Sequence, residues 1–178
     1  ALYLTTPAQA QLTPPALKPI IGARHPALSP DGQRLAFVYR GDIWLAASKG
    51  GRARPLTFHL EYDAYPVFSP DGHWIAFASK RHGQWDIFVI PAEGGQARRL
   101  TWHSGHEIPF GWSPNGQHIA YGARRDSPRY CLMSVEVSTY KSKVLVEDYA
   151  ALRYPRWSPD GKTLLYSRYG MPWYRPRY

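Results

Sequence analysis

The sequence predicts an all-β fold: a β-propeller of four-stranded antiparallel blades, incomplete, with three full blades and part of a fourth. Three observations predict it. The phrase Ser-Pro-(Asp/Asn)-Gly recurs four times, beginning at Ser29, Ser69, Ser113 and Ser158. The spacings of 40, 44 and 45 residues match the length of a propeller blade. Short apolar runs bounded by Gly and Pro surround each copy, and they alternate as strands do.

Each copy of the phrase predicts a tight turn between two strands. Proline presets its own φ, Asp or Asn bonds the nearby backbone, and Gly accepts a positive φ. We expect structural repeat turns and no catalytic residue among them, because a nucleophilic serine normally occurs once and needs a partner histidine. The turn positions are Ser29, Pro30, Asp31, Gly32, Ser69, Pro70, Asp71, Gly72, Ser113, Pro114, Asn115, Gly116, Ser158, Pro159, Asp160 and Gly161.

The second repeat shows how a blade divides into four strands. They are expected near residues 65–69, 73–79, 85–92 and 97–102, and the last is the most polar, so it is placed outermost. A Gly-Gly turn precedes that fourth strand in the first two repeats; the third repeat has no such turn, and the fourth ends before its last two strands. The expected blades are residues 24–58, 64–103, 108–147 and 154–178, the last truncated.

The N-terminal residues differ from the repeats. Residues 1–10 are apolar and end in Ala-Gln-Ala, which resembles the cleavage site of a secretory signal peptide. We interpret 1–10 as the tail of a signal peptide, 11–23 as a linker and 24–178 as the partial propeller. The chain is then expected to begin inside a longer reading frame, and the mature protein to be exported to the periplasm or outside of a bacterium. An ordinary N-terminal extension is the alternative.

Composition restricts the partners. The formal charge is +9, but the basic residues are dispersed, which favours a solvated surface over a nucleic-acid site. No stretch approaches the roughly 18 apolar residues of a membrane span. The single cysteine, Cys131, lies in a strand-like apolar run and has no zinc-ligand spacing around it. We expect no cofactor, no metal, no nucleic acid and no membrane span.

Polar positions recur in the connections between blades. Each connection opens with a histidine and has an acid four residues later: His59 with Asp63, and His103 with Glu107, with His106 as a third imidazole. These five positions are candidate polar residues at the rim of a central channel. One interpretation is a metal or polar-ligand site. The other is backbone hydrogen bonding between blades, repeated because the blade repeats.

These repeats resemble a known family. The segments RHPALSPDGQRLAFVYRGDIWL (24–45), LTFHLEYDAYPVFSPDG (56–72) and VIPAEGGQARRLTWHSGHEIPFGWSPNG (89–116) are similar to the PD40, or WD40-like, β-propeller repeat. That repeat occurs in TolB, in prolyl-oligopeptidase-type enzymes and in the tricorn proteases. The resemblance covers residues 24–169, and it is closest to the N-terminal propeller of bacterial tricorn-like peptidases of the S41 type.

The resemblance implies a non-catalytic propeller segment that binds polypeptide substrate, or gates its access, in an exported tricorn-like serine peptidase. The family's nucleophile and histidine lie in downstream domains, so no catalytic residue maps onto this sequence. Implied partners are a polypeptide substrate or protein partner, the remaining blades and a downstream domain of the same chain. Two alternatives stay open: a TolB-like periplasmic interaction scaffold, and the propeller of a prolyl-oligopeptidase-type hydrolase.

Overall fold

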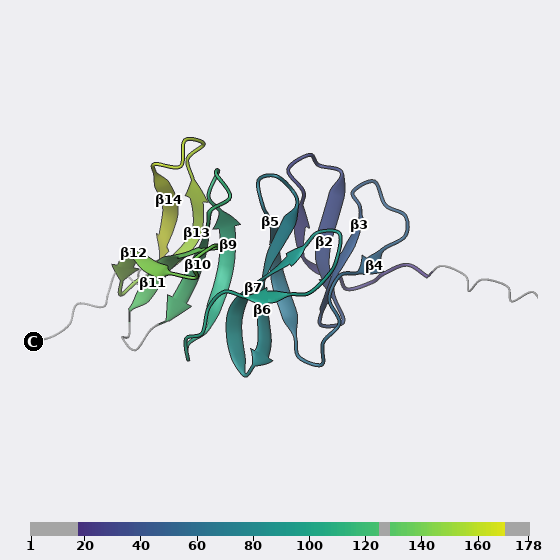
Figure 1. Ribbon diagram of the computed structural model, residues 1–178, viewed down its shortest axis with the longest axis horizontal. Coiled ribbons are helices and arrows are strands. Elements are labelled where there is room, and N and C mark those ends of the chain that lie inside the picture. Colours follow the sequence, from purple (N-terminus) through teal and green to yellow (C-terminus); the bar gives the residue numbers. More distant parts are fainter. Residues whose placement is uncertain (1–17, 125–128, 170–178) are drawn as a thin grey trace, which may run out of the picture.

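The computed structural model describes residues 18–124 and 129–169, which form four antiparallel β-sheets and no helix (Figure 1). None of these residues lies in a helix long and apolar enough to cross a membrane. The predictions made for residues 1–17 and for 170–178 lie outside the described residues. The strands are β1 (Arg24–Leu28), β2 (Arg34–Tyr39), β3 (Asp42–Ala47), β4 (Arg54–Pro55), β5 (Asp63–Phe68), β6 (Trp74–His82), β7 (Gln84–Pro91), β8 (Arg98–Arg99), β9 (Glu107–Trp112), β10 (His118–Arg124), β11 (Tyr130–Glu136), β12 (Ser142–Asp148), β13 (Ala151–Trp157) and β14 (Leu164–Tyr169).

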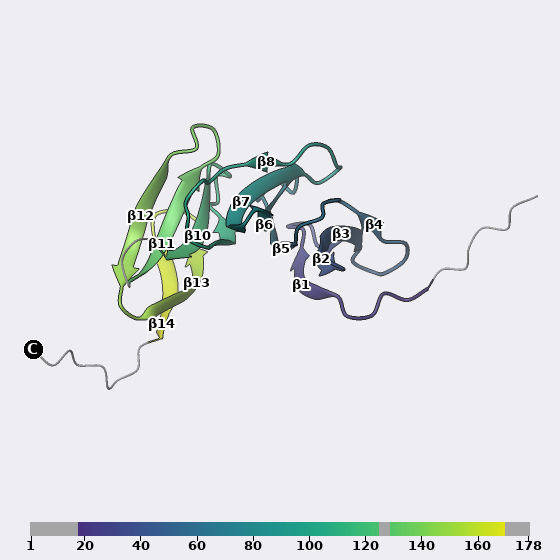
Figure 2. The same ribbon diagram turned by 90° about the horizontal axis from the view of Figure 1, so that it is seen from below.

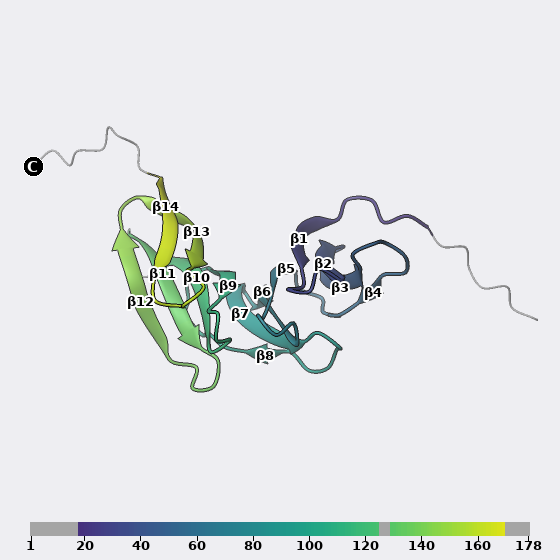
Figure 3. The same ribbon diagram turned by 90° about the horizontal axis from the view of Figure 1, so that it is seen from above.

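Each sheet is a blade whose strands pair in chain order. Blade 1 is β1–β4, blade 2 is β5–β8, blade 3 is β9–β12, and blade 4 is the β13–β14 hairpin. The predicted all-β fold, with three full blades and part of a fourth, is confirmed. Figures 2 and 3 show the blades fanned into an open arc, with β1, β5, β9 and β13 towards its concave side and β8 and β12 on its convex side.

Blade 2 shows why its strands are nearly continuous apolar runs. Side chains alternate between the two faces of a strand, and here both faces are covered by a neighbouring blade. From β6, Phe77 packs into the core shared with blade 1, while Ala76 packs into the core shared with blade 3. From β7, Phe88 packs into the core shared with blade 1, and Val89 packs into the core shared with blade 3. Stacking against neighbours therefore buries both faces of the sheet.

In each of blades 1 and 2, a threonine just after the short outer strand forms a hydrogen bond with the third strand. The hydroxyl of Thr57 accepts the N–H of Ile43, and the hydroxyl of Thr101 accepts the N–H of Ile87, each at 2.9 Å. Both threonines are buried, so the bond satisfies a donor that water does not reach. This geometry explains why an Asp-Ile pair and a later Leu-Thr pair recur together in the sequence.

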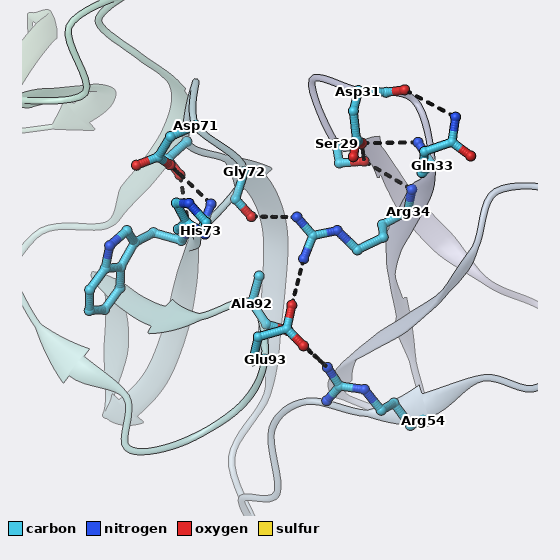
Figure 4. A network of polar contacts seen from close by, with 12 residues as sticks. Ser29, Asp31, Gln33, Arg34, Arg54, Asp71, Gly72, His73, Ala92 and Glu93 are labelled. Atoms are coloured by element: carbon cyan, nitrogen blue, oxygen red, sulfur yellow. Dashed lines mark hydrogen bonds and ion pairs between the residues drawn. The ribbon is translucent and has the colours of Figure 1, made fainter.

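The Ser-Pro-Asp-Gly turn of blade 2 and the turn at Glu93 lie beside the Ser-Pro-Asp-Gly turn of blade 1. Hydrogen bonds link the two blades here (Figure 4). Arg34 of blade 1 donates to the carbonyl oxygen of Gly72 at 2.7 Å and to the carboxylate of Glu93 at 3.0 Å. Arg54 donates to the carbonyl oxygen of Ala92 at 2.9 Å. Glu93 is largely exposed, so water screens its ion pair and the carbonyl contacts do most of the positioning.

Candidate binding surface

The innermost strands of the four blades form the concave surface of the arc. β1, β5, β9 and β13 are each the first strand and one edge of their sheet. β1 contacts β5, β5 contacts β9, and β9 contacts β13. Figures 2 and 3 show these strands facing the same side. Side chains from successive blades therefore lie next to one another along this concave surface.

A β-bulge interrupts the innermost strand of each blade. In blade 2, Ala64 pairs with Ala78 and Val67 pairs with Ala76, so Tyr65 and the proline after it face a single residue of β6. The same two-against-one arrangement occurs at residues 25–26 in blade 1 and 154–155 in blade 4. A bulge bends the strand and changes the direction of a side chain, and bulges are frequent beside binding sites.

The residue before the bulge proline adopts a left-handed backbone in three blades. The φ angles are 50° at His25, 56° at Tyr65 and 54° at Tyr154. A non-glycine residue with positive φ is uncommon and costs of order 1–3 kcal/mol. The same unfavourable backbone thus holds a ring side chain at one position of three blades, and all three rings line one cavity.

Blade 3 departs from this pattern, and its sequence explains the departure. The proline lies three residues before the turn serine in blades 1, 2 and 4, but Pro109 lies four residues before Ser113. The unpaired residue of the bulge is then Phe110, which follows the proline. Phe110 also lines the cavity, so blade 3 still contributes a ring, from a different bulge position.

Rings of blades 1 and 2 contact one another, tilted between His25 and Tyr65 and edge-to-face between Tyr65 and Trp85. The ring centroids of His25 and Tyr65 are 4.1 Å apart, and those of Tyr65 and Trp85 are 5.9 Å apart. Burial, followed by the charge of Arg24, lowers the pKa of His25, which favours the neutral imidazole at neutral pH. Tyr154 is 58% exposed, so it is accessible to a ligand in the cavity that it lines.

The rings surround an open cavity of about 650 Å³. Its walls come from the innermost strands and from the ends of β10 and β11. Apolar walls with a few polar groups are typical of ligand sites. His25, Tyr65, Phe110 and Tyr154 are not among the positions that the repeat pattern predicts, although a signal marks most of them: a residue before proline, four positions before a turn serine. The apolar lining residues are Pro26, Pro66, Val67, Ile108, Pro109, Ala123, Ala151 and Leu152.

The first two predicted rim residues, His59 and Asp63, make separate contacts. His59 is exposed. Its ring Nδ1 accepts the backbone N–H of Glu61 at 3.0 Å, and the backbone N–H of His59 donates to the carboxylate of Asp42 at 3.2 Å. Asp63 is fully buried and forms an ion pair with Arg81 at 2.8 Å. The two side chains are therefore engaged separately, and the cavity walls include neither of them.

The second set behaves in the same way, with one difference. His103 Nδ1 accepts the N–H of Gly105 at 2.9 Å, and Glu107 is fully buried. His106 Nδ1 accepts the N–H of Trp85 at 3.2 Å, which joins blade 3 to blade 2. Of the five predicted rim positions, His106 alone belongs to the cavity walls. Within residues 18–124 and 129–169, no three His, Cys, Asp or Glu side chains are grouped to hold a metal.

The serines of the repeat turns are held by local hydrogen bonds. The Ser29 hydroxyl donates to Asp31 and accepts the N–H of Arg34 at 2.9 Å (Figure 4). The Asp31 carboxylate also accepts the N–H of Gln33 at 3.0 Å. The bonds from the serine hydroxyl and from this N–H lower the pKa of the Asp31 carboxyl. The turns at Ser69, Ser113 and Ser158 repeat this arrangement, with Asn115 accepting in place of Asp.

Comparison with known proteins places these blades in context. The family model of the tricorn protease N-terminal beta propeller domain matches residues 23–176. The uncharacterized peptidase YuxL of Bacillus subtilis (strain 168) is 34% identical over 74 residues, which cover 36% of this chain and 11% of that protein. The chain thus spans about a tenth of this relative's length.

Solved structures share the fold. The putative TolB of Agrobacterium tumefaciens superposes with a TM-score of 0.73 at 24% identity, covering 81% of this chain and 53% of that one. The tricorn protease superposes with a TM-score of 0.60 at 25% identity, covering 69% of this chain and 13% of that one. TolB of Acinetobacter baumannii gives a TM-score of 0.66 at 22% identity, covering 79% and 36%. Below 25% identity, the likeness concerns the propeller fold itself.

Proposed function

Because this chain belongs to the tricorn protease N-terminal β-propeller family, we propose that it is a non-catalytic binding segment of a larger peptidase. Its concave surface binds an extended polypeptide substrate and controls access to a serine peptidase domain of the same protein. The parent protein is exported, in line with the Ala-Gln-Ala site near the N-terminus. The repeat turns hold the blades, and the innermost strands carry the recognition.

One observation carries this proposal: ring side chains from successive blades converge on one cavity. His25, Tyr65 and Tyr154 project from equivalent bulges, and Phe110 projects from the bulge of blade 3. A strained backbone that recurs at one position indicates a function when it also presents a side chain to a site. Aromatic faces and proline rings bind the side chains of an extended chain through apolar contact.

The shape of the site favours an extended chain. A cavity of about 650 Å³ holds a few residues of a polypeptide, but it does not admit a folded domain. Each innermost strand contains a proline within its bulge or beside it, which lacks an N–H and interrupts the strand edge. A bound chain is therefore hindered from extending the sheet, and side-chain contacts must supply the recognition.

The test removes one ring without changing the bulge. Asparagine tolerates a left-handed backbone, so Tyr154→Asn retains the local conformation and deletes the ring. We expect its affinity for short unstructured peptides, measured by fluorescence anisotropy, to fall about fivefold, because one aromatic contact contributes about 1 kcal/mol. Tyr169→Asn is the matched control: Tyr169 is 63% exposed but is not part of the cavity wall.

Two results would oppose the proposal. If neither the wild-type chain nor the variants bind unstructured peptides, the concave surface is not a polypeptide site. If both tyrosine variants lose affinity equally, binding does not depend on the cavity. The link to a peptidase has a separate test, which is to read the gene beyond the codon for Tyr178. A serine peptidase domain there would support control of substrate access to a peptidase. A stop codon after a few more blades would favour a TolB-like interaction scaffold.

A further inference from the structure

Among the described residues, the cavity wall carries positive charge. Three arginines, Arg124, Arg153 and Arg156, belong to that wall, and none of its described residues is Asp or Glu. The guanidinium of Arg156 donates to the carbonyl oxygens of Pro155 at 3.0 Å and Phe110 at 3.4 Å. Each guanidinium has five N–H donors, so these two contacts orient Arg156 and leave donors for a ligand.

Arginines elsewhere in the described residues are commonly paired with acids. Neither Arg153 nor Arg156 has a carboxylate partner within residues 18–124 and 129–169. Both are exposed, so keeping them unpaired costs little in the free protein. Arg24, Arg40, Arg52 and Arg98 also have no acid partner among the described residues. What distinguishes Arg153 and Arg156 is that they line the aromatic cavity, where their charge is available to a ligand. The paired arginines are Arg34 and Arg54 with Glu93, Arg81 with Asp63, Arg99 with Asp86, Arg129 with Glu147, and Arg168 with Asp148.

The surrounding chemistry favours an acidic polypeptide over a nucleic acid. Single-stranded nucleic acid is bound along a continuous positive groove that follows its phosphates. Here the arginines lie within walls that are mainly proline, aliphatic and aromatic. A polypeptide that alternates acidic side chains with apolar or aromatic ones matches both features. Its carboxylates reach the guanidinium groups while its apolar side chains cover the rings.

We propose that the concave surface selects extended polypeptides rich in acidic side chains, with Arg153 and Arg156 binding their carboxylates. This inference rests on the proposed function and adds the class of substrate. Carboxylate–guanidinium contacts are stronger than neutral hydrogen bonds and specify charge, whereas the rings bind apolar side chains of any sequence. The rings therefore give general affinity, and the two arginines give the preference.

The experiment compares three short peptides that alternate Tyr with Glu, Gln or Lys. Both ends are blocked, so that side chains alone differ in charge, and binding to the whole chain is followed by fluorescence anisotropy at low and high salt. We expect the Glu peptide to bind about tenfold more tightly than the Gln peptide at low salt. The double variant Arg153→Gln/Arg156→Gln should lose that preference. Arg52→Gln removes one positive charge at the turn after Gly50 and Gly51, outside the cavity wall, and should keep it.

The single variant Arg153→Glu is expected to fold normally. Arg153 is exposed, and no hydrogen bond or ion pair holds its side chain in the described residues. It should shift preference from the Glu peptide towards the Lys peptide. Equal binding of Glu and Gln peptides, with ring dependence retained, overturns this inference and leaves the proposed function standing. Loss of all peptide binding removes both. Tighter binding of a short oligodeoxythymidylate through the same arginines also overturns the inference.

Discussion

Blade 2 and blade 4 carry the same repeat in opposite surroundings. Both begin with a bulged inner strand and a Ser-Pro-Asp-Gly turn. In blade 2 every central residue of β6 and β7 is buried, because blades 1 and 3 cover its two faces. In blade 4, five of the six residues of β14 are exposed. The same local sequence therefore forms the same turn, while burial depends on the neighbours.

The comparison separates local from nearest-neighbour stability. In stacked repeats the stability is approximately a sum of terms within each repeat and terms between adjacent repeats. The turn bonds belong to the first kind and occur in both blades. The apolar contacts of blade 2 belong to the second kind, and blade 4 shares them with blade 3 alone in the described residues. Changes that remove packing should thus distinguish the blades most strongly.

The largest difference is expected for the central strands. Phe77 is fully buried, and Phe77→Ala should lower the free energy of unfolding by about 3–5 kcal/mol because it leaves a cavity between blades 1 and 2. Leu165 on β14 is 74% exposed, and Leu165→Ala should change it by less than about 0.5 kcal/mol. Urea denaturation of both variants measures this, and equal losses would contradict the nearest-neighbour interpretation.

A smaller difference is expected for the turn serine. Ser69 is buried and its hydroxyl accepts the N–H of Trp74 at 2.9 Å; Ser158 is partly exposed and accepts the N–H of Thr163 at the same distance. Ser69→Ala leaves a donor away from water and should cost about 1–2 kcal/mol, whereas Ser158→Ala should cost about 0.5 kcal/mol. Denaturation with matched serine-to-threonine controls checks it; a larger loss in blade 4 would show that burial does not set the cost.

The smallest effect is a pH dependence at the edge of blade 4. The hydrogen bond from Arg168, then the N–H of Ala150, lowers the pKa of Asp148 from 3.8 to about 2. A lowered pKa stabilises the folded state above pH 3.8, and this contribution is lost as the pH falls towards about 2. Asp86 in blade 2 has the opposite sign, because burial raises its pKa and its contribution declines as the pH rises above 3.8.

Hydrogen exchange of the β14 amides, corrected for the intrinsic effect of pH, measures this contact. Exchange in the wild-type hairpin should become faster as the pH falls from 4 towards 2. In Asp148→Asn, exchange should already be fast at pH 4 and change little as the pH falls. If the wild-type and Asp148→Asn hairpins respond alike to acid, the ion pair does not hold the hairpin against blade 3.

The candidate rim residues illustrate the limit of spacing. His59 with Asp63, and His103 with Glu107, have the same separation in the sequence. The spacing cannot state that Asp63 turns inward to Arg81 while the imidazole of His59 faces its own loop, because these directions depend on the packing of β6 beneath them. Of the five positions, His106 alone reaches the cavity.

The sequence by itself determined the repeat, the strand order and the turns. Their bonds join residues no more than five positions apart, as from Ser29 to Arg34, so local chemistry is sufficient. Tertiary structure alone decided the site. His25, Tyr65 and Tyr154 belong to different blades, and they meet because stacking brings the inner strands together on one concave side. That Arg153 and Arg156 have no acid partner among the described residues is likewise a property of the folded chain, because it depends on which acids the fold places nearby.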